Sequence, residues 1–152
     1  MRYILATVGA ALVLAAPAHA EQWRAVAENE SAPKTLMFVD QASLTRTGDT
    51  ATAWVMTVLE DDTTGQRDWN HSVIYRQVDC TKKQSQMMHS KFYMNDRILE
   101  DDTSPGDWSP IREGSMIDGV ADVMCGREDY LTDVIDDPFA VSQLYFKSGD
   151  SK

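Results

Sequence analysis

The sequence predicts an α+β domain, in which an antiparallel β-sheet of about six strands is followed by C-terminal helices packed on one face. Up to residue 102, short segments rich in β-branched and aromatic residues alternate with turn residues, a pattern typical of hairpins. Helix capping signals and helical spacing first occur near residue 115. No repeat or low-complexity linker interrupts this order. We therefore expect one domain at residues 21–147, between a signal peptide at 1–20 and a disordered tail at 148–152.

The strand signals are alternation of apolar and polar residues, ended by turn residues. Trp23, Ala25 and Ala27 share one face by the two-residue period of a strand. Gly48-Asp49 and Asn95-Asp96 are typical of turns. Strands are expected at residues 23–28, 36–39 (continuing after a bulge through 43–45), 50–60, 69–80, 86–94 and 98–99.

The segment 50–60 is the strongest strand signal and carries apolar residues on both faces. Trp54, Met56 and Val58 alternate with Ala53, Val55 and Leu59. A strand with two apolar faces is typical of the centre of a sheet that is covered on both sides. The sequence therefore predicts helices or loops over this strand.

Two helices are predicted after the sheet. Ser115 and Asp118 form a capping-box-like pair, and Gly126 is suited to the left-handed conformation that ends a helix. The inward stripe of this first helix is Met116, Val120, Val123 and Met124. Asp137-Pro138 begins a second helix over 139–147, and the residues expected to pack on one side of it are Ala140, Val141, Leu144 and Tyr145.

Residues 1–20 have the pattern of a secretory signal. Arg2 gives a positive start, an apolar core follows, and Ala18-His19-Ala20 is a small-x-small cleavage site. The apolar core is shorter than the roughly 20 residues that a membrane span needs. We expect cleavage after Ala20. Because no cysteine at the cleavage site can carry a lipid, we expect a periplasmic or secreted protein with no membrane span.

Export decides how the cysteines are interpreted. Cys80 and Cys125 are the two cysteines of the chain, and an exported protein is free to oxidise them. A redox dithiol usually has the Cys-x-x-Cys spacing, which is absent. A zinc site needs four ligands. Besides the two cysteines, the expected mature chain offers only His71 and His89 as zinc ligands of the usual nitrogen or sulfur type. A structural disulfide that joins helix to sheet is the preferred interpretation.

Charge and motifs narrow the function classes. The net charge of −10 opposes binding to nucleic acid and to anionic lipid, and it suits cationic partners or divalent ions. Phosphate loops, zinc-protease motifs and nucleophile elbows are missing. We interpret His71 and His89 as surface residues of strands, and we predict no catalytic residue, no metal ligand and no cofactor.

Two further clusters leave alternatives open. The acidic clusters are Asp61-Asp62, Glu100-Asp101-Asp102, Glu128-Asp129, and Asp133 with Asp136-Asp137. We interpret them as solvated turn residues and helix caps. The alternative is a weak divalent-cation site in the last of these clusters. Met87, Met88 and Met94, with Phe92 and Tyr93, either line a groove for a partner or fill the core under a helix. The core interpretation is preferred.

Several residues are spaced in a recognisable order along the chain, namely Trp23, Val39-Asp40, Ser43, Trp54, Asp79-Cys80, Trp108, Pro110, Gly114-Ser115, Val123 and Cys125. In this order they resemble the surface-adhesin protein E-like domain family, and the part from Gly126 to Lys152 lies outside the resemblance. The resemblance implies an antiparallel sheet with a helix packed on it and a cysteine bridge. It also implies a bacterial surface adhesin that binds host extracellular-matrix and serum proteins.

Together these observations predict an exported, non-enzymatic interaction or adhesin-like domain of the bacterial cell envelope. A protein partner is expected to bind at a sheet edge and at exposed aromatic residues, with Trp108 and Tyr93 as the candidates. The alternative is a periplasmic protein that binds a small molecule or a divalent ion. The oligomeric state is left open.

Overall fold

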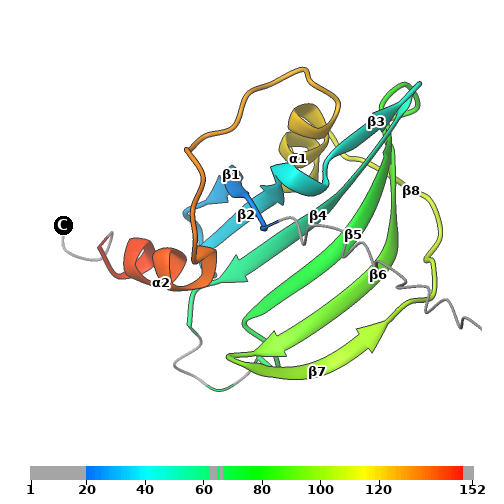
Figure 1. Ribbon diagram of the computed structural model, residues 1–152. Coiled ribbons are helices and arrows are strands. Elements are labelled where there is room, and N and C mark those ends of the chain that lie inside the picture. Colours follow the sequence, from blue (N-terminus) through cyan, green and yellow to red (C-terminus); the bar gives the residue numbers. More distant parts are fainter. Residues whose placement is uncertain (1–19, 62–64, 66, 149–152) are drawn as a thin grey trace, which may run out of the picture.

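The computed structural model describes residues 20–61, 65 and 67–148, and it confirms the α+β fold class (Figure 1). The predicted signal peptide, apart from Ala20, and residues 149–152 lie outside the described residues. An antiparallel sheet of eight strands has the main order β1-β2-β4-β5-β6-β7, with β3 paired to β4 and β8 to β6. The strands are β1 (Trp23–Asn29), β2 (Thr35–Asp40), β3 (Thr45–Thr47), β4 (Thr50–Leu59), β5 (His71–Asp79), β6 (Gln84–Met94), β7 (Arg97–Asp102) and β8 (Ser109–Pro110), and the helices are α1 (Met116–Met124) and α2 (Pro138–Ser148).

The predicted hairpins are present, but one predicted strand continuation is wrong. The turns between β3 and β4 and between β6 and β7 contain Gly48 and Asn95, both with positive φ. Residues 43–45 do not continue β2 through a bulge, because a 3-10 turn at Gln41–Ser43 follows it. Asp40 caps this turn by accepting a hydrogen bond from the Ala42 amide at 3.1 Å. A local side-chain cap here competes successfully with the strand.

The predicted two-sided burial of β4 is confirmed, and it separates the helices. Ala51, Ala53 and Val55 belong to a core cluster with α1, whereas Met56 and Val58 belong to a second cluster with Phe146 of α2. Because successive strand residues point to opposite faces, the two helices lie on opposite faces of the sheet. The expectation that both helices pack on one face is therefore wrong.

The first helix follows its sequence signals closely. Ser115 Oγ accepts a hydrogen bond from the Asp118 amide at 3.3 Å, and Gly126 ends the helix region with a φ of 73°. Val120, Val123 and Met124 are buried against the sheet as predicted. α1 packs on β1, β2 and β4.

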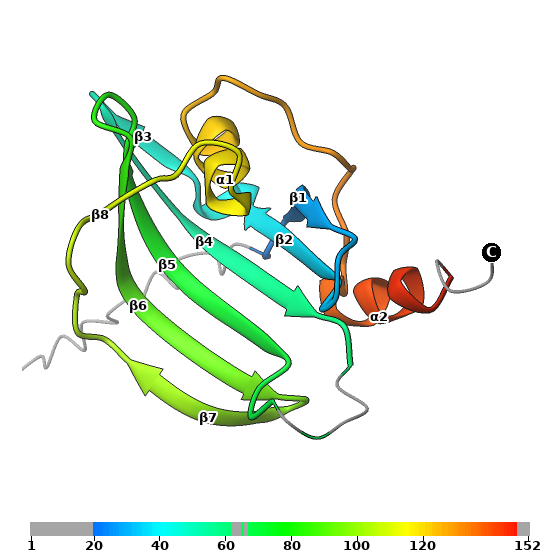
Figure 2. The ribbon, with the colours of Figure 1, turned by 180° about the vertical axis from the view of Figure 1, so that it is seen from behind.

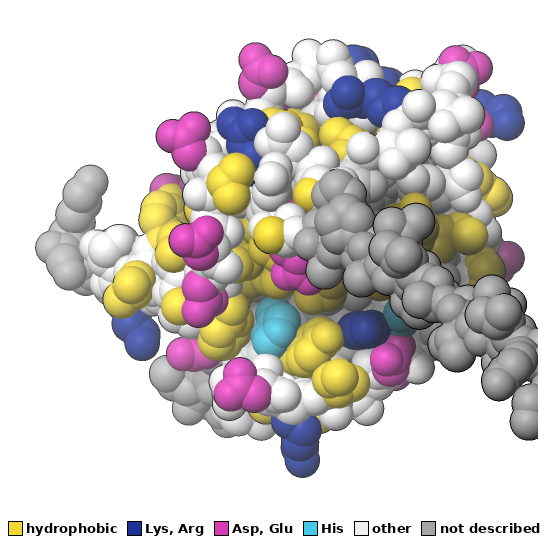
Figure 3. Space-filling model, viewed as in Figure 1, with side chains coloured by type: hydrophobic (Ala, Val, Ile, Leu, Met, Phe, Trp, Pro, Cys, Tyr) yellow, Lys and Arg dark blue, Asp and Glu magenta, His cyan; other side chains and the backbone are white. Residues whose placement is uncertain are grey.

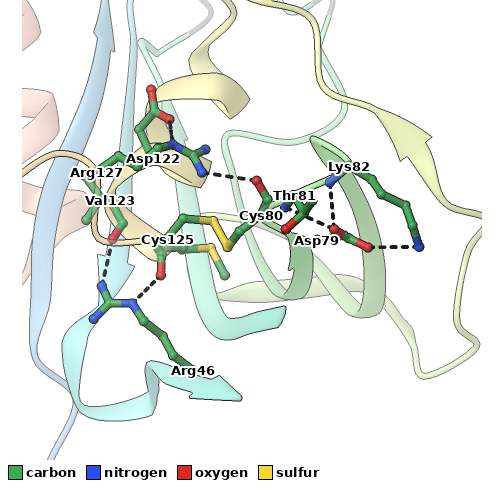
Figure 4. Close-up of a disulfide and its surroundings, with 10 residues drawn as sticks. Arg46, Asp79, Cys80, Thr81, Lys82, Asp122, Val123, Cys125 and Arg127 are labelled. Atoms are coloured by element: carbon green, nitrogen blue, oxygen red, sulfur yellow. Dashed lines mark hydrogen bonds and ion pairs between the residues drawn. A yellow bond between two sulfur atoms is a disulfide. The ribbon is translucent and has the colours of Figure 1, made fainter. Parts of the chain in front are cut away.

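The disulfide between Cys80 and Cys125 is confirmed, and it joins the end of β5 to the C-cap of α1. Figure 4 shows two arginines that support the same junction. Arg46 donates to the carbonyl oxygens of Met124 at 2.6 Å and Val123 at 2.9 Å. Arg127 donates to the Asp122 carboxylate at 2.6 Å and to the Cys80 carbonyl at 3.3 Å. Cations at the C-terminus of a helix also interact favourably with its dipole.

The segment between the helices covers the β1 edge of the sheet. The amides of Leu131 and Ile135 donate to the carbonyls of Ala25 and Trp23, both at 2.8 Å. The Ala25 amide in turn donates to Thr132 Oγ1 at 3.0 Å. In Figures 1 and 2 this segment, coloured orange, runs along β1 from α1 to α2. One edge of the sheet is thus closed by the chain itself.

The second helix begins at Pro138 as predicted, but its packed face differs from the prediction. Ser142, Gln143 and Phe146 are buried, whereas Val141, Leu144 and Tyr145 are exposed. The polar members of the buried face are satisfied, because Ser142 Oγ donates to the Pro138 carbonyl and Gln143 Nε2 to the Leu59 carbonyl. Hydrogen bonding therefore allows a partly polar face to be buried. Ser148 belongs to the helix, one residue beyond the predicted end.

Replacing Cys125 with serine should lower the free energy of unfolding by about 2–5 kcal/mol, because the oxidised chain loses a cross-link. The cross-link spans a sequence separation of 45, for which the chain-entropy model gives about 4 kcal/mol. Denaturant unfolding measures the change. Thiol titration of the unfolded, unreduced wild-type protein should find no free thiol, and two reactive thiols would contradict the disulfide.

The packing of α2 gives a matched pair of substitutions. Phe146 is 2% exposed and Leu144 is 70% exposed on the same helix. Phe146→Ala should lower the free energy of unfolding by about 3–5 kcal/mol through lost burial and a cavity, whereas Leu144→Ala should change it by less than about 0.5 kcal/mol. Urea unfolding of both variants tests this, and equal effects would refute the observed orientation.

Candidate binding site

An aromatic groove lies on the α2 side of the sheet. It has a volume of about 310 Å³, and its lining residues are Glu21, Trp23, Trp54, Met56, His71, Val73, Lys91 and Tyr93. In Figure 3 hydrophobic side chains gather around the histidines on this face, with a basic side chain among them. The name "aromatic groove" is used below for this site.

Strand register explains why these residues meet. Met56 pairs with Val73, which pairs with Lys91, and Val58 pairs with His71, which pairs with Tyr93. Directly paired residues in neighbouring strands point to the same face of a sheet. Rows of side chains from β4, β5 and β6 thus form the floor and walls of the groove. β1 contributes Trp23 at the side.

The groove is open because α2, the helix on this face of the sheet, does not reach its outer half. α2 packs on β4, whereas α1 lies on the opposite face. Figures 1 and 2 show β5, β6 and β7 extending beyond both helices. Side chains of β5 and β6 on this face are accordingly half-buried, including those of His71, Lys91 and Tyr93. The site is a preformed concave surface with partly accessible aromatic rings.

Ring contacts hold the walls in place. The His71 ring stacks on the Tyr93 ring, with centroids 4.5 Å apart and an interplanar angle of 7°. Phe139 of α2 contacts the same His71 ring at 4.9 Å. The Trp54 ring contacts Tyr75 and His89, each at 5.2 Å between centroids. Such ring pairs stabilise a defined arrangement beyond simple burial.

Charged groups stand on both sides of the groove. The Glu21 carboxylate accepts a hydrogen bond from Trp23 Nε1 at 2.8 Å. Lys91 Nζ lies 3.9 Å from the Asp101 carboxylate and 6.0 Å from the Trp54 ring centroid. The same carboxylate contacts His89 Nε2 at 2.6 Å. The positive charge of Lys91 is therefore matched by an acid of β7.

His71 is a wall of the groove, and burial lowers its pKa, an effect that Asp96 partly opposes. Its Nδ1 lies 3.2 Å from Asn70 Oδ1, which also accepts a hydrogen bond from the Asn95 amide. Because an amide oxygen only accepts, Nδ1 is the donor in this pair. The ring thus donates through Nδ1, and its lowered pKa favours the neutral form.

The two predicted binding residues lie at opposite ends of β6. Tyr93 lines the aromatic groove. Trp108 is 41% exposed and precedes β8, whose Ser109 pairs with Ser85. Eight residues of strand separate Ser85 from Tyr93, which corresponds to roughly 26 Å at 3.3 Å per residue. The structure thus places both candidates at the surface without bringing them together.

The expectation that the methionines of β6 fill the core is wrong. His71 and His89 are partly exposed strand residues, and each also contacts an aromatic ring on the groove side of the sheet. Met87 is exposed, and neither Met88 nor Met94 belongs to the buried core clusters. Within residues 20–61, 65 and 67–148 no helix covers their part of the sheet, so the described chain offers no core for them to fill. The groove alternative agrees with the position of Tyr93.

The β7 edge differs from the β1 edge. Every residue of β7 is exposed, among them Ile98 and Leu99. A bulge interrupts its pairing with β6 between Phe92 and Tyr93, and the strand carries the acidic run 100–102. Bulges and charges protect edge strands against pairing with other chains. Binding is therefore favoured at the open face of the sheet rather than through backbone pairing at this edge.

Arg76 is a buried cation on the opposite face of β5. It donates to Ser85 Oγ at 3.2 Å, and its Nε makes no hydrogen bond within the described residues. Burial lowers its pKa. Its alternation with Tyr75 points it away from the aromatic groove. Arg76 therefore does not line the groove, whose charged lining residues are Glu21 and Lys91.

Apart from Asp62, which lies outside the described residues, the acidic clusters are loop and edge residues in this structure. Asp137 caps α2 by accepting from the Ala140 amide at 2.9 Å, and Asp102 accepts from the Ser104 amide at 2.8 Å. Within residues 20–61, 65 and 67–148, no three His, Cys, Asp or Glu side chains gather as a metal site would require. The helices in that part of the chain are also too short or too polar to cross a membrane.

Tyr93 is the one groove residue that was predicted as a site residue. The groove residues that were not predicted are Glu21, Trp23, Trp54, Met56, His71, Val73 and Lys91. The signal that could have found them is the alternation on the segments 50–60, 69–80 and 86–94, which places Trp54, His71, Lys91 and Tyr93 on related faces once the hairpin registers are known. The bulges in the register cannot be located from alternation alone.

The lowered pKa of His71 predicts a pH dependence of stability. The folded state binds this proton less readily than the unfolded state, so its contribution is full above the ordinary pKa of about 6.5 and is lost as the pH falls below it. When the pH falls from 7.5 to 5.5, the free energy of unfolding should decrease less for His71→Phe than for the wild-type protein, because phenylalanine does not titrate. Denaturant unfolding at both pH values tests this, and identical losses would contradict the prediction.

Comparison with known proteins identifies the family of this fold. No curated protein and no solved structure matches the chain. The family model described as "Surface-adhesin protein E" matches residues 23–126, which include all strands, α1 and both cysteines. The match begins at the first strand and ends directly after the disulfide, so the edge segment and α2 follow it. The chain belongs to the surface-adhesin protein E family.

Proposed function

We propose that this protein is an exported, non-enzymatic interaction domain of the bacterial cell envelope, and that it binds a protein partner at the aromatic groove. Membership of an adhesin family supports a role in binding. The predicted signal peptide and the disulfide suit an oxidising compartment. Periplasmic and secreted locations are both compatible with this proposal.

The open aromatic groove is the observation that carries the proposal. Exposed or half-exposed aromatic rings in a preformed hollow are typical of the centre of a protein interface, where Trp and Tyr contribute most of the binding energy. Trp54, His71 and Tyr93 offer such rings, held by mutual contacts. Little ordering of the site is then needed on binding, which lowers the entropic cost.

Trp108 is proposed as a second contact. It is exposed near the opposite end of β6, beside the loop in which the Gly106 amide donates to the Met87 carbonyl. A partner that follows β6 would reach both sites. The groove remains the principal site, because its rings line a hollow of about 310 Å³.

Substitutions of the exposed aromatic residues test whether they bind the partner. Tyr93→Ala should weaken partner binding by about 30-fold, as for an interface hot spot, and Trp108→Ala should weaken it less. Leu144→Ala on α2 is the control and should leave binding unchanged. Pull-down from envelope and extracellular-matrix extracts, followed by affinity measurement with the captured partner, tests these expectations.

Histidine variants test the alternative that the protein is an enzyme. The double variant His71→Phe/His89→Phe keeps aromatic rings at both positions and removes both imidazoles, so binding should persist. Loss of biological activity in this variant, with an unchanged circular dichroism spectrum, would favour chemistry over binding. Capture that is independent of Tyr93 and Trp108 would refute the proposed site.

A further inference from the structure

We propose that the aromatic groove receives a cationic side chain of the protein partner, an arginine guanidinium or a lysine ammonium. This inference rests on the proposed function and names the chemistry of the contact. The groove combines the half-buried rings of Trp54 and Tyr93 with one carboxylate, that of Glu21, which the buried Trp23 holds by a hydrogen bond. Aromatic faces attract cations through their quadrupole, and a carboxylate beside them adds direct charge pairing.

The chain already places its own cations on aromatic rings. The guanidinium of Arg24 lies 4.2 Å from the Tyr130 ring centroid, and Lys91 Nζ lies 6.0 Å from that of Trp54. The second of these contacts is inside the groove. The Trp54 ring thus already has a cation near it. Lys91 Nζ lies at about the largest distance, 6 Å, at which a cation and a ring attract each other appreciably.

The Glu21 carboxylate is held in position for pairing. Trp23 Nε1 donates to its Oε2 at 2.8 Å. A carboxylate can accept several hydrogen bonds, so one indole donor leaves most of its accepting capacity for a guest. A planar guanidinium can pair with a carboxylate and stack on a ring at the same time. Arginine thus fits the groove better than lysine.

The surrounding charge favours a cation over an anion. Lys91 is the basic residue of the lining, and its charge is matched by Asp101 at 3.9 Å. Burial lowers the pKa of His71, which favours its neutral form. Asp96 acts electrostatically at the same ring, and the whole chain has a net charge of −10. Long-range attraction and the local carboxylate therefore act in the same direction.

Processing adds one charge that the experiment must include. If cleavage follows Ala20, the α-ammonium of Glu21 lies beside the side-chain carboxylate of the same residue. This group competes with a guest, so the chain that begins at Glu21 is the one to use. Its ordinary pKa is about 7.7–8.0, and affinity for a cationic guest should therefore increase between pH 7 and pH 9.

The test uses blocked peptides of the form Gly-Gly-X-Gly-Gly, in which X is arginine, citrulline, norleucine or glutamate. Citrulline has nearly the shape of arginine without its charge. NMR titration should show that the arginine peptide shifts the indole Nε1–H signals of Trp23 and Trp54, and not those of Trp69 or Trp108. Arginine should bind about fivefold more tightly than citrulline, the effect of roughly 1 kcal/mol.

Two charge variants determine the sign of the guest. Glu21→Gln should weaken arginine binding about fivefold, and Lys91→Gln should strengthen it by a similar factor, because it removes a competing cation. Glu100→Gln is the control, since it changes the net charge like Glu21→Gln at an exposed position of β7. A larger effect of Glu21→Gln than of Glu100→Gln supports a local contact.

Several outcomes would overturn the inference. Tighter binding of the glutamate peptide, or weaker arginine binding after Lys91→Gln, would identify an anion site. Equal binding of arginine, citrulline and norleucine would show an apolar anchor without charge selection. If no peptide binds while Tyr93→Ala still abolishes partner capture, the proposed function stands and the cationic guest is refuted. If arginine binds and no partner is captured, the proposed function alone fails.

Discussion

The burial of β4 on both faces is the constraint from which the rest of the structure follows. A strand with apolar residues on both sides needs cover on both sides. On one face α1 supplies Val120, Val123 and Met124. On the other face Phe146 of α2 joins Met56 and Val58. The disulfide then fixes α1 to the end of β5, so that the first layer cannot separate from the sheet without breaking a covalent bond.

The same constraint explains why a site remains. Both helices are short, and they cover the part of the sheet around β4. The rows that start at Met56 and Val58 continue outward through β5 to Lys91 and Tyr93 of β6, beyond the reach of α2. The inner end of each row is core, and the outer end is a partly exposed wall. The aromatic groove is therefore the uncovered continuation of the second hydrophobic core.

The segment after the family match completes the fold. It closes the β1 edge through hydrogen bonds to Trp23 and Ala25, and it supplies α2 as cover for the second face. Its Phe139 contacts the His71 ring of the groove. A segment outside the shared family domain thus shapes the candidate site.

The sequence by itself determined the elements whose signals are local. Alternation located the long strands, Ser115 and Gly126 bounded α1, and export with two cysteines predicted the disulfide. The family order predicted the fold. These features depend on neighbouring residues, on periodicity or on composition, all of which are written directly in the chain. Tyr93 was named as a candidate because it lies among methionine and aromatic residues that could line a groove for a partner.

Only the tertiary structure decided which faces meet. The packed side of α2 could not be predicted, because Ser142 and Gln143 are buried through hydrogen bonds to Pro138 and Leu59, and the latter is distant in sequence. The cap at Asp40 replaced a strand continuation for a similar reason, since the Asp40 carboxylate also accepts from Gln22. The groove depends on a bulged register between β5 and β6 and on how far α2 extends over its face of the sheet. These features are set by packing between residues that are far apart in the sequence, so no local sequence pattern predicts them.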